Sequence, residues 1–224
     1  MKKRIQFYLI LIGLLFGWHL RLTGQHLFIL SGQSNMVRMD EKQTFIPTLE
    51  HALGKEQIVV VKDAHGGQPI RQWLPPNSLF DSLMHKLEEK DLALDKMKTI
   101  TFIWMQGERD AREQLGLIYE EQLWNLYQRL TNNLRVNKMY FIIGRINDFD
   151  LNNDRYPDWT LIREIQVKVG NSEPHFDWVN TDDLNDGINH LGTPIENDLH
   201  LTPEGYLTLG ERFANAALRL MENN

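Results

Sequence analysis

The sequence has no cysteine among its 224 residues. Both a disulfide and a lipid-modified cysteine are therefore excluded, although export to an oxidising compartment permits disulfides without requiring them. The chain also lacks internal repeats, low-complexity tracts and a linker rich in proline or serine. Its apolar share of 42% and charged share of 24% are typical of a globular protein, and its length suffices for one sizeable core. We therefore expect a single folded domain.

No apolar run reaches the roughly 20 residues that a bilayer-spanning helix needs. The longest, residues 5–20, has 16 positions and follows the basic stretch Lys2, Lys3 and Arg4. A basic start before a short apolar run is typical of a secretory signal. We expect residues 1–24 to be a signal peptide and residues 25–224 to be the mature domain. That domain would be secreted or periplasmic without stable membrane association, and an uncleaved anchor is the alternative interpretation.

An excess of positive charge is missing as well. The chain has 24 basic and 30 acidic residues, which gives a net charge of −6. Residues 1–24 contain four of the basic residues and none of the acidic ones, so the mature part would carry about −10. Proteins that bind nucleic acids normally carry the opposite sign. We therefore expect no nucleic-acid partner, and a sugar ligand agrees better with this charge.

Five short apolar runs predict strands. Two of them are continuous and rich in Val, Ile and aromatic residues, as expected for strands that are buried on both faces of a parallel sheet. The runs are residues 26–30, 58–61, 100–105, 139–143 and 176–179.

Apolar residues at helical spacing lie between and after these runs. The strongest patterns cover residues 115–134 and 206–220, and weaker ones cover residues 78–90 and 160–169. Thr202 and Pro203 open the last pattern with a capping hydroxyl and a first-turn proline. Strands that alternate with helices predict an α/β fold, here a three-layer αβα sandwich around a parallel sheet of about five strands.

Ligands bind beyond the carboxyl ends of the strands in such sheets. Polar or glycine-rich segments follow the first four predicted strands, and another precedes the last helix. These segments are residues 31–36, 65–70, 106–110, 144–148 and 197–201. Because they converge on one edge of one sheet, we expect the functional site there.

The residues in these loops fit acyl transfer. A serine hydroxyl is a weak nucleophile that needs a neighbouring base, and histidine is the usual one because its pKa lies near neutrality. Ser34 follows the first strand, and His200 comes from the opposite end of the chain. Gly66 or Gly67 offers a backbone N–H and Gln106 a side-chain amide for the oxyanion that forms in the reaction.

Three motifs resemble a known family. Gly-Gln-Ser-Asn-Met at residues 32–36, Trp-Met-Gln-Gly-Glu at 104–108 and Asp-Leu-His-Leu at 198–201 are similar to the sialate O-acetylesterase and acetylxylan esterase group of the SGNH (GDSL-like) hydrolases. This group includes carbohydrate esterase family six. The resemblance implies a flavodoxin-like fold and no metal or organic cofactor.

By this resemblance the protein is a serine carbohydrate O-acetylesterase that acts on an acetylated carbohydrate through an acetyl-enzyme. Ser34 would be the nucleophile and His200 the base. The backbone N–H groups of Ser34 and Gly67 and the side chain of Gln106 would form the oxyanion hole.

The acid that orients His200 stays open between three readings. Many SGNH enzymes have an aspartate three residues before the histidine, but Asn197 occupies that position here and Asp198 stands two before. Asp198 is the slightly favoured acid. Glu108 is its rival, because members of the acetylxylan branch are read as using the glutamate of the Gln-Gly-Glu motif, which is Glu108 here. The third reading is a dyad in which a backbone carbonyl orients His200.

Other residues are candidates for substrate contacts. Asn35 and Arg145 lie in the converging loops, and Trp73 beside two prolines is predicted to be an exposed platform for a sugar ring. Trp104 is expected in the core. The spacing of the loop histidines His65, His175 and His190 matches no metal-ligand pattern.

Two other functional hypotheses remain at this stage. The Asn197 departure allows a non-catalytic carbohydrate-binding protein on a degenerate esterase scaffold. An esterase that acts on a lipid, a thioester or another non-sugar ester is the second. The sequence leaves open which acetylated sugar is used and makes no prediction of oligomeric state.

Overall fold

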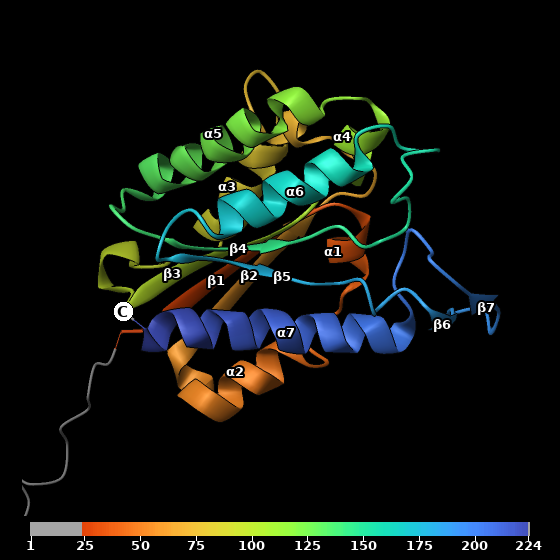
Figure 1. Cartoon of the computed structure of the whole chain (residues 1–224). Helices are drawn as coiled ribbons and strands as arrows, with labels where there is room; N and C mark the ends of the chain where they lie inside the picture. The colour runs from red at the N-terminus through yellow and green to blue at the C-terminus, as the bar shows by residue number, and fades with distance from the viewer. Residues whose placement is uncertain (1–23, 224) are drawn as a thin grey trace, which may run out of the picture.

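The computed structural model describes residues 24–223 (Figure 1). The predicted signal peptide, residues 1–24, lies outside this part of the chain except for Gly24. The chain joins the sheet at Gln25, whose carbonyl accepts a hydrogen bond of 2.8 Å from the backbone N–H of Lys98. Within residues 24–223, no helix combines the length and the apolar character needed to cross a bilayer.

Five parallel strands form the central sheet in the order β2-β1-β3-β4-β5. Each strand lies at one of the predicted apolar runs. They are β1 His26–Gly32, β2 Ile58–Ala64, β3 Thr99–Met105, β4 Tyr140–Gly144 and β5 Phe176–Val179. This strand order is that of flavodoxin-like sheets, in which the chain winds first to one edge and then to the other. The predicted fold class is confirmed.

Helices cover both faces of the sheet (Figure 1). On one face lie α3 Leu79–Glu88, α4 Glu108–Arg112, α5 Gly116–Leu134 and α6 Trp159–Gly170. On the other lie α2 Phe45–Leu53 and α7 Pro203–Glu222. The shorter elements are α1 Ser34–Arg38, the 3-10 helices η1 Lys55–Gln57, η2 Ile70–Trp73 and η3 Leu94–Lys96, and the hairpin β6 Gly187–Ile188 with β7 Pro194–Ile195.

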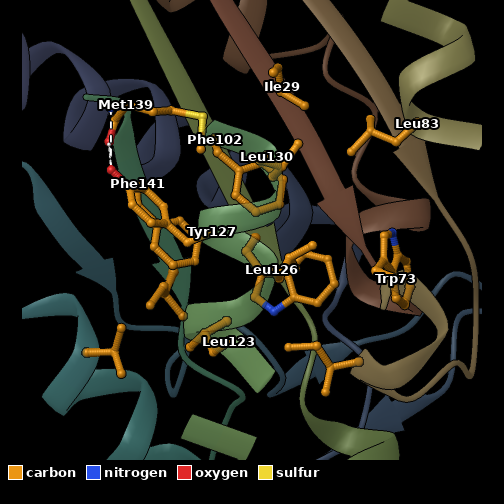
Figure 2. Close-up of a cluster of buried hydrophobic side chains, with 14 of the residues drawn as sticks. Ile29, Trp73, Leu83, Phe102, Leu123, Leu126, Tyr127, Leu130, Met139 and Phe141 are labelled. Carbon is orange, nitrogen blue, oxygen red and sulfur yellow. Dashed lines mark hydrogen bonds between the residues drawn. The ribbon is translucent and has the colours of Figure 1, made fainter. Parts of the chain in front are cut away.

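Successive residues of each strand point to opposite faces, so the sheet has two cores. Phe102 belongs to the core under α3, α5 and α6, whereas Ile103 belongs to the core under α2 and α7. In Figure 2 the ring of Phe102 stacks on Phe141, with centroids 5.4 Å apart, and Tyr127 of α5 covers Phe141 at 5.5 Å. Burial on both faces is why these strands are continuously apolar rather than alternating.

The four predicted helices are confirmed as α3, α5, α6 and α7. The predicted cap of α7 is present, because Oγ1 of Thr202 accepts a hydrogen bond of 2.9 Å from the backbone N–H of Gly205. The sequence did not predict α2 or the β6–β7 hairpin.

The prediction that Trp73 is an exposed sugar platform is wrong. Its side chain has no exposed surface, and its ring meets Trp104 edge to face at 4.9 Å. Its indole N–H donates to Oγ of Ser31 at 3.1 Å, so the polar end of the ring is satisfied inside the protein. Trp73 therefore stabilises the core beside β1, and Trp104 lies in the core as expected.

Gly32 sets the course of the chain at the end of β1. Its φ of 143° is a conformation that favours glycine, and a Cβ there would lie 2.0 Å from the carbonyl oxygen of Met105. Without a side chain, the end of β1 stays close to β3. Gln33 then completes the turn by donating its N–H to Met105, so that α1 begins at Ser34 on the sheet's carboxyl edge.

Candidate active site

Ser34 and His200 meet at this edge. The hydroxyl Oγ of Ser34 lies 3.2 Å from Nε2 of His200, although 166 positions separate the two residues in the chain. Ser34 opens α1, and His200 lies two residues before the Thr202 cap of α7. Both side chains are partly accessible, so a substrate can reach the pair. A hydroxyl within hydrogen-bond reach of an imidazole is the geometry that an activated serine requires.

Three asparagine amides hold the loop in front of His200. Asn147 and Asn185 each donate a hydrogen bond of 3.0 Å to the carbonyl of Asp198. Asn35 donates to the carbonyl of Leu199 at 3.2 Å. The three amides come from different parts of the chain, so the position of the imidazole is fixed from several sides.

Asp198 is the carboxylate beside the imidazole. Its Oδ1 accepts a hydrogen bond of 2.8 Å from the backbone N–H of His200 and lies 4.0 Å from the ring atom Nδ1. The second distance is too long for a direct hydrogen bond. Asp198 therefore caps the backbone of the base and places a negative charge near its ring.

The pKa of His200 is lowered from its ordinary value. Burial is the largest cause, and the positive charges of Arg38 and His190 act in the same direction. The negative charge of Asp198 opposes them. A lowered pKa favours the neutral imidazole, which is the form that accepts a proton.

Glu108, the rival for the acid, is bonded to Asn35. Its Oε1 accepts a hydrogen bond of 2.8 Å from the amide of Asn35, while its Oε2 is buried without a hydrogen-bond partner in the described part of the chain. The Glu108 side chain is almost fully buried, and this burial raises its pKa to about 7. No hydrogen bond joins Glu108 to His200 within residues 24–223, so its effect on the base passes through Asn35.

Asn35 links the two halves of the site. Its Oδ1 accepts a hydrogen bond of 2.8 Å from the hydroxyl of Tyr206, and its amide donates to Glu108 and to the carbonyl of Leu199. Its side chain is buried, with 1% exposed. In the structure this side chain holds the site together, and its predicted contact with the substrate stays a prediction.

Backbone N–H groups are free beside the serine. A Cβ placed on Gly66 would lie 4.0 Å from Cβ of Ser34, so the segment after β2 adjoins the hydroxyl. Gly67 has a φ of 69°, which favours glycine. Within residues 24–223 the N–H groups of Ser34 and Gly67 donate to no protein acceptor. Such donors are available to a ligand oxygen.

Gln106 is fully buried at the end of β3. Its amide nitrogen donates to Oε1 of Gln33 at 3.2 Å, to the carbonyl of Gln68 at 3.1 Å and to the carboxylate of Asp110. It would have to release one of these acceptors to bind an oxyanion, so its predicted role stays a prediction. Asp110 also accepts the N–H of Ile70 at 2.9 Å and thereby ties the loop after β2 to α4.

Arg145 is not part of the Ser34–His200 cluster. Its guanidinium pairs with Asp182 and Asn180 and lies over the ring of Trp178, 4.9 Å from the centroid. Asp182 also binds Arg163 at 2.8 Å. The structure shows Arg145 in an ion-pair network at the end of β4, and its predicted substrate contact stays a prediction.

A cavity of about 470 Å³ lies next to the pair, beneath the start of α7. The sequence reasoning missed it. Its lining residues are Arg38, Asp40, Gln43, His190, Leu201, Pro203, Tyr206 and Leu207. One signal was available: Arg38 follows Ser34 by four residues, which in a helix places both on one face.

Within residues 24–223, no group of three histidine, aspartate or glutamate side chains is arranged to hold a metal ion.

A flavodoxin-like sandwich with a serine and a histidine in contact at the carboxyl edge defines an SGNH-type hydrolase scaffold. The family of "Carbohydrate esterase, sialic acid-specific acetylesterase" matches residues 37–219. This match covers most of the chain, and the protein belongs to that family. It is therefore a carboxylic ester hydrolase by class. The match includes His200 but starts just after Ser34, so the pairing of the two comes from the geometry.

Solved structures agree on the fold. A protein from Arabidopsis thaliana superposes with a TM-score of 0.68 at 19% identity, covering 88% of this chain and 98% of that one. A carbohydrate acetylesterase from Xanthomonas citri gives 0.65 at 19% identity, covering 88% of this chain, which in turn spans 56% of that protein. NanS superposes with a TM-score of 0.63 at 12% identity, covering 90% of this chain and 99% of that one. No curated protein matches the sequence. At these identities the likeness concerns the fold alone.

Proposed function

We propose that the protein is a serine carbohydrate O-acetylesterase. The observation that supports this most is the 3.2 Å approach of the Ser34 hydroxyl to Nε2 of His200. The two free backbone N–H groups beside the hydroxyl and the membership of a carbohydrate esterase family agree with it. The ester would be an acetyl group on a sugar, cleaved to acetate and the free sugar hydroxyl.

The first half-reaction forms an acetyl-enzyme. His200, neutral at working pH, takes the proton of Ser34 while Oγ attacks the carbonyl carbon of the acetyl group. The N–H groups of Ser34 and Gly67 donate to the oxygen that becomes negative. When the tetrahedral intermediate collapses, the carbon–oxygen bond to the sugar breaks, and the imidazolium returns its proton to the sugar oxygen.

The second half-reaction releases acetate. His200 takes a proton from a water molecule, which attacks the acetyl carbon, and the same N–H groups hold the oxyanion. The bond to Oγ then breaks, and Ser34 recovers its proton from the imidazolium. Asp198 favours the imidazolium by its nearby charge, and we assign it the role of the acid. Glu108 positions the site through Asn35.

Export is part of the proposal. Residues 1–24 would direct the protein out of the cytoplasm. Outside the cytoplasm, polymeric carbohydrates are accessible to it. Detection of the mature domain outside the cytoplasm, beginning near Gln25, would support this, and a full-length protein retained in the cytoplasm would contradict it.

The test compares Ser34→Ala with Ser172→Ala on a chromogenic acetate and on a panel of acetylated sugars. Ser172 is an exposed serine before β5, on the opposite edge of the sheet, and so controls for the loss of a hydroxyl. We expect Ser34→Ala to abolish hydrolysis with an unchanged circular dichroism spectrum, and Ser172→Ala to behave as wild type. Hydrolysis by Ser34→Ala at the wild-type rate would refute the proposal.

A further inference from the structure

The cavity beside the Ser34–His200 pair contains a positive charge one helical turn from the nucleophile. Arg38 is the last residue of α1, and Ser34 is the first. A spacing of four residues sets the two about 6 Å apart along the helix axis and on the same face. The guanidinium is near enough to His200 to lower the pKa of its ring. The backbone of Arg38 therefore stands at a fixed offset from that of Ser34, within reach of a ligand held at the hydroxyl.

Tyr206 joins the cavity to the buried network of the site. Its hydroxyl donates to Oδ1 of Asn35 at 2.8 Å. Tyr206 also lines the cavity. Arg38 thus shares the cavity with a residue of the network that fixes the loop of His200, while its own side chain is exposed and accessible to a ligand.

The charge of Arg38 is not neutralised by the protein. Within residues 24–223, Arg38 forms no salt bridge, whereas Arg145 and Arg163 each pair with Asp182. The cavity includes one carboxylate, Asp40. That group is already engaged, since it accepts hydrogen bonds from the N–H of Lys42 at 3.0 Å and from the amide of Gln43 at 3.3 Å.

The hydrogen bond from the backbone N–H of Lys42 is the largest cause that lowers the pKa of Asp40, and the amide of Gln43 and the positive charges of Lys42 and Lys62 act in the same direction. The carboxylate is therefore compensated without Arg38. An uncompensated guanidinium in a cavity next to a nucleophile is suited to a ligand anion, because its planar fork matches a carboxylate with two parallel hydrogen bonds.

The rest of the cavity fits a sugar ring. Leu201, Pro203 and Leu207 provide apolar surface, and Tyr206 and His190 provide polar groups at its edge. The volume of about 470 Å³ lies within the roughly 300–1,000 Å³ of small-ligand sites. A mixture of apolar wall and a few directed polar groups is what binding of a sugar unit requires.

We propose that Arg38 is a specificity-determining residue that binds a carboxylate on the acetylated sugar while the acetyl ester lies at Ser34. This inference rests on the proposed function. The short offset between the two residues requires the carboxylate and the ester to belong to the same sugar unit or to adjacent ones. A uronic acid and a sialic acid both present this chemistry, and they are separate arms of the test.

The kinetic test uses matched substrates that differ only in charge. O-acetylated galacturonic acid and O-acetylated sialic acid are each compared with their methyl esters, and the release of acetate is measured. Wild type should prefer the free acid in at least one arm by about tenfold or more in kcat/KM, the range of a charge-assisted hydrogen bond. Arg38→Gln should abolish the preference, and Arg38→Lys should retain part of it.

The control is Arg219→Gln at the far end of α7, where an exposed arginine pairs with Asp177 at 3.0 Å. It should keep the wild-type preference. The inference would be overturned if wild type had equal kcat/KM values for acid and methyl ester with both sugars. It would also be overturned if Arg38→Gln lowered kcat/KM equally for the acid and the methyl ester.

A binding measurement separates this inference from the proposed function. Calorimetry with the Ser34→Ala protein and each free acid tests recognition without turnover. Binding that weakens about tenfold in the Ser34→Ala, Arg38→Gln double variant supports the role of Arg38, even if wild type releases no acetate. Binding that is equal in the two proteins contradicts it, even if wild type is an active esterase.

Discussion

Oδ1 of Asp198 contacts His200 through the backbone: it lies 2.8 Å from the backbone nitrogen and 4.0 Å from Nδ1 of the ring. In the Ser-His-Asp arrangement of other hydrolases the carboxylate binds the ring directly, and its loss costs about 10⁴ in rate. A carboxylate at the longer distance supplies mainly charge and loop geometry. The loss of Asp198 should therefore be less severe.

We predict that Asp198→Asn lowers kcat/KM by about 10- to 100-fold, well short of the 10⁴ that a directly bonded acid supplies. It should also move the acid limb of the pH profile to lower pH, because the Asp198 charge raises the pKa of His200. Steady-state kinetics between pH 4 and 9 test both effects. A loss of about 10⁴, or an unmoved limb, would show that the role of Asp198 is assigned wrongly.

Arg38 acts on the same ionisation in the opposite direction. Burial lowers the pKa of His200 most, and Arg38 and His190 lower it further. The negative charge of Asp198 raises this pKa. In Arg38→Gln the pKa of His200 should rise, and the acid limb of kcat/KM should move to higher pH. A neutral chromogenic acetate is the substrate for this profile, so that recognition of a carboxylate does not contribute. A limb that moves to lower pH would contradict this account.

Glu108 should affect stability more than catalysis. Burial raises its pKa from 4.5 to about 7. The folded protein then holds a proton that the unfolded chain has lost, so this residue's contribution to stability is complete below about pH 4.5 and falls as pH rises to about 7. Glu108→Gln keeps an oxygen for Asn35 and removes the titration.

Urea unfolding of Glu108→Gln and wild type at pH 5 and pH 8 measures this effect. The variant should gain stability relative to wild type at pH 8, on the order of 1–3 kcal/mol more than at pH 5. Burial also raises the pKa of Asp110, which is present in both proteins. The charge of Asp110 adds to the rise in the pKa of Glu108, so the difference includes this coupling. The kcat of the variant should stay within about tenfold of wild type. A larger loss of kcat with unchanged stability would instead identify Glu108 as the catalytic acid.

Thr202 connects the cap of α7 to the position of His200. Thr202→Ala removes the acceptor for the N–H of Gly205 and should destabilise the protein by about 1 kcal/mol. Thr202→Ser keeps the hydroxyl and is the matched control. Thermal unfolding measures the difference, and equal midpoints for the two variants would show that the cap contributes nothing.

Much of the fold could be predicted because its signals are local. The apolar run at β4 is continuous because helices bury both faces of the sheet there, whereas the run at the edge strand β2 is mostly half-buried. The motif at α7 contains its own cap. Ser34 and His200 could be paired because parallel strands bring the loops after them to one edge. These inferences need only the order of the elements.

The remaining features depend on tertiary contacts. Trp73 stands beside two prolines, which suggested exposure, but η2 turns its ring onto Trp104 and Ser31. Asn35 could be placed in a converging loop, but its bonds to Glu108 and Tyr206 join segments that are far apart in sequence. No spacing rule predicts such contacts.

The most direct test of the central claim is covalent labelling by a fluorophosphonate, followed by intact-mass and peptide mass spectrometry. We predict one adduct, on Ser34, formed at the wild-type rate in Ser172→Ala, absent in Ser34→Ala and slowed at least 100-fold in His200→Asn. An adduct on another residue, no adduct in wild type, or labelling of Ser34 at full rate without the His200 imidazole would contradict the account.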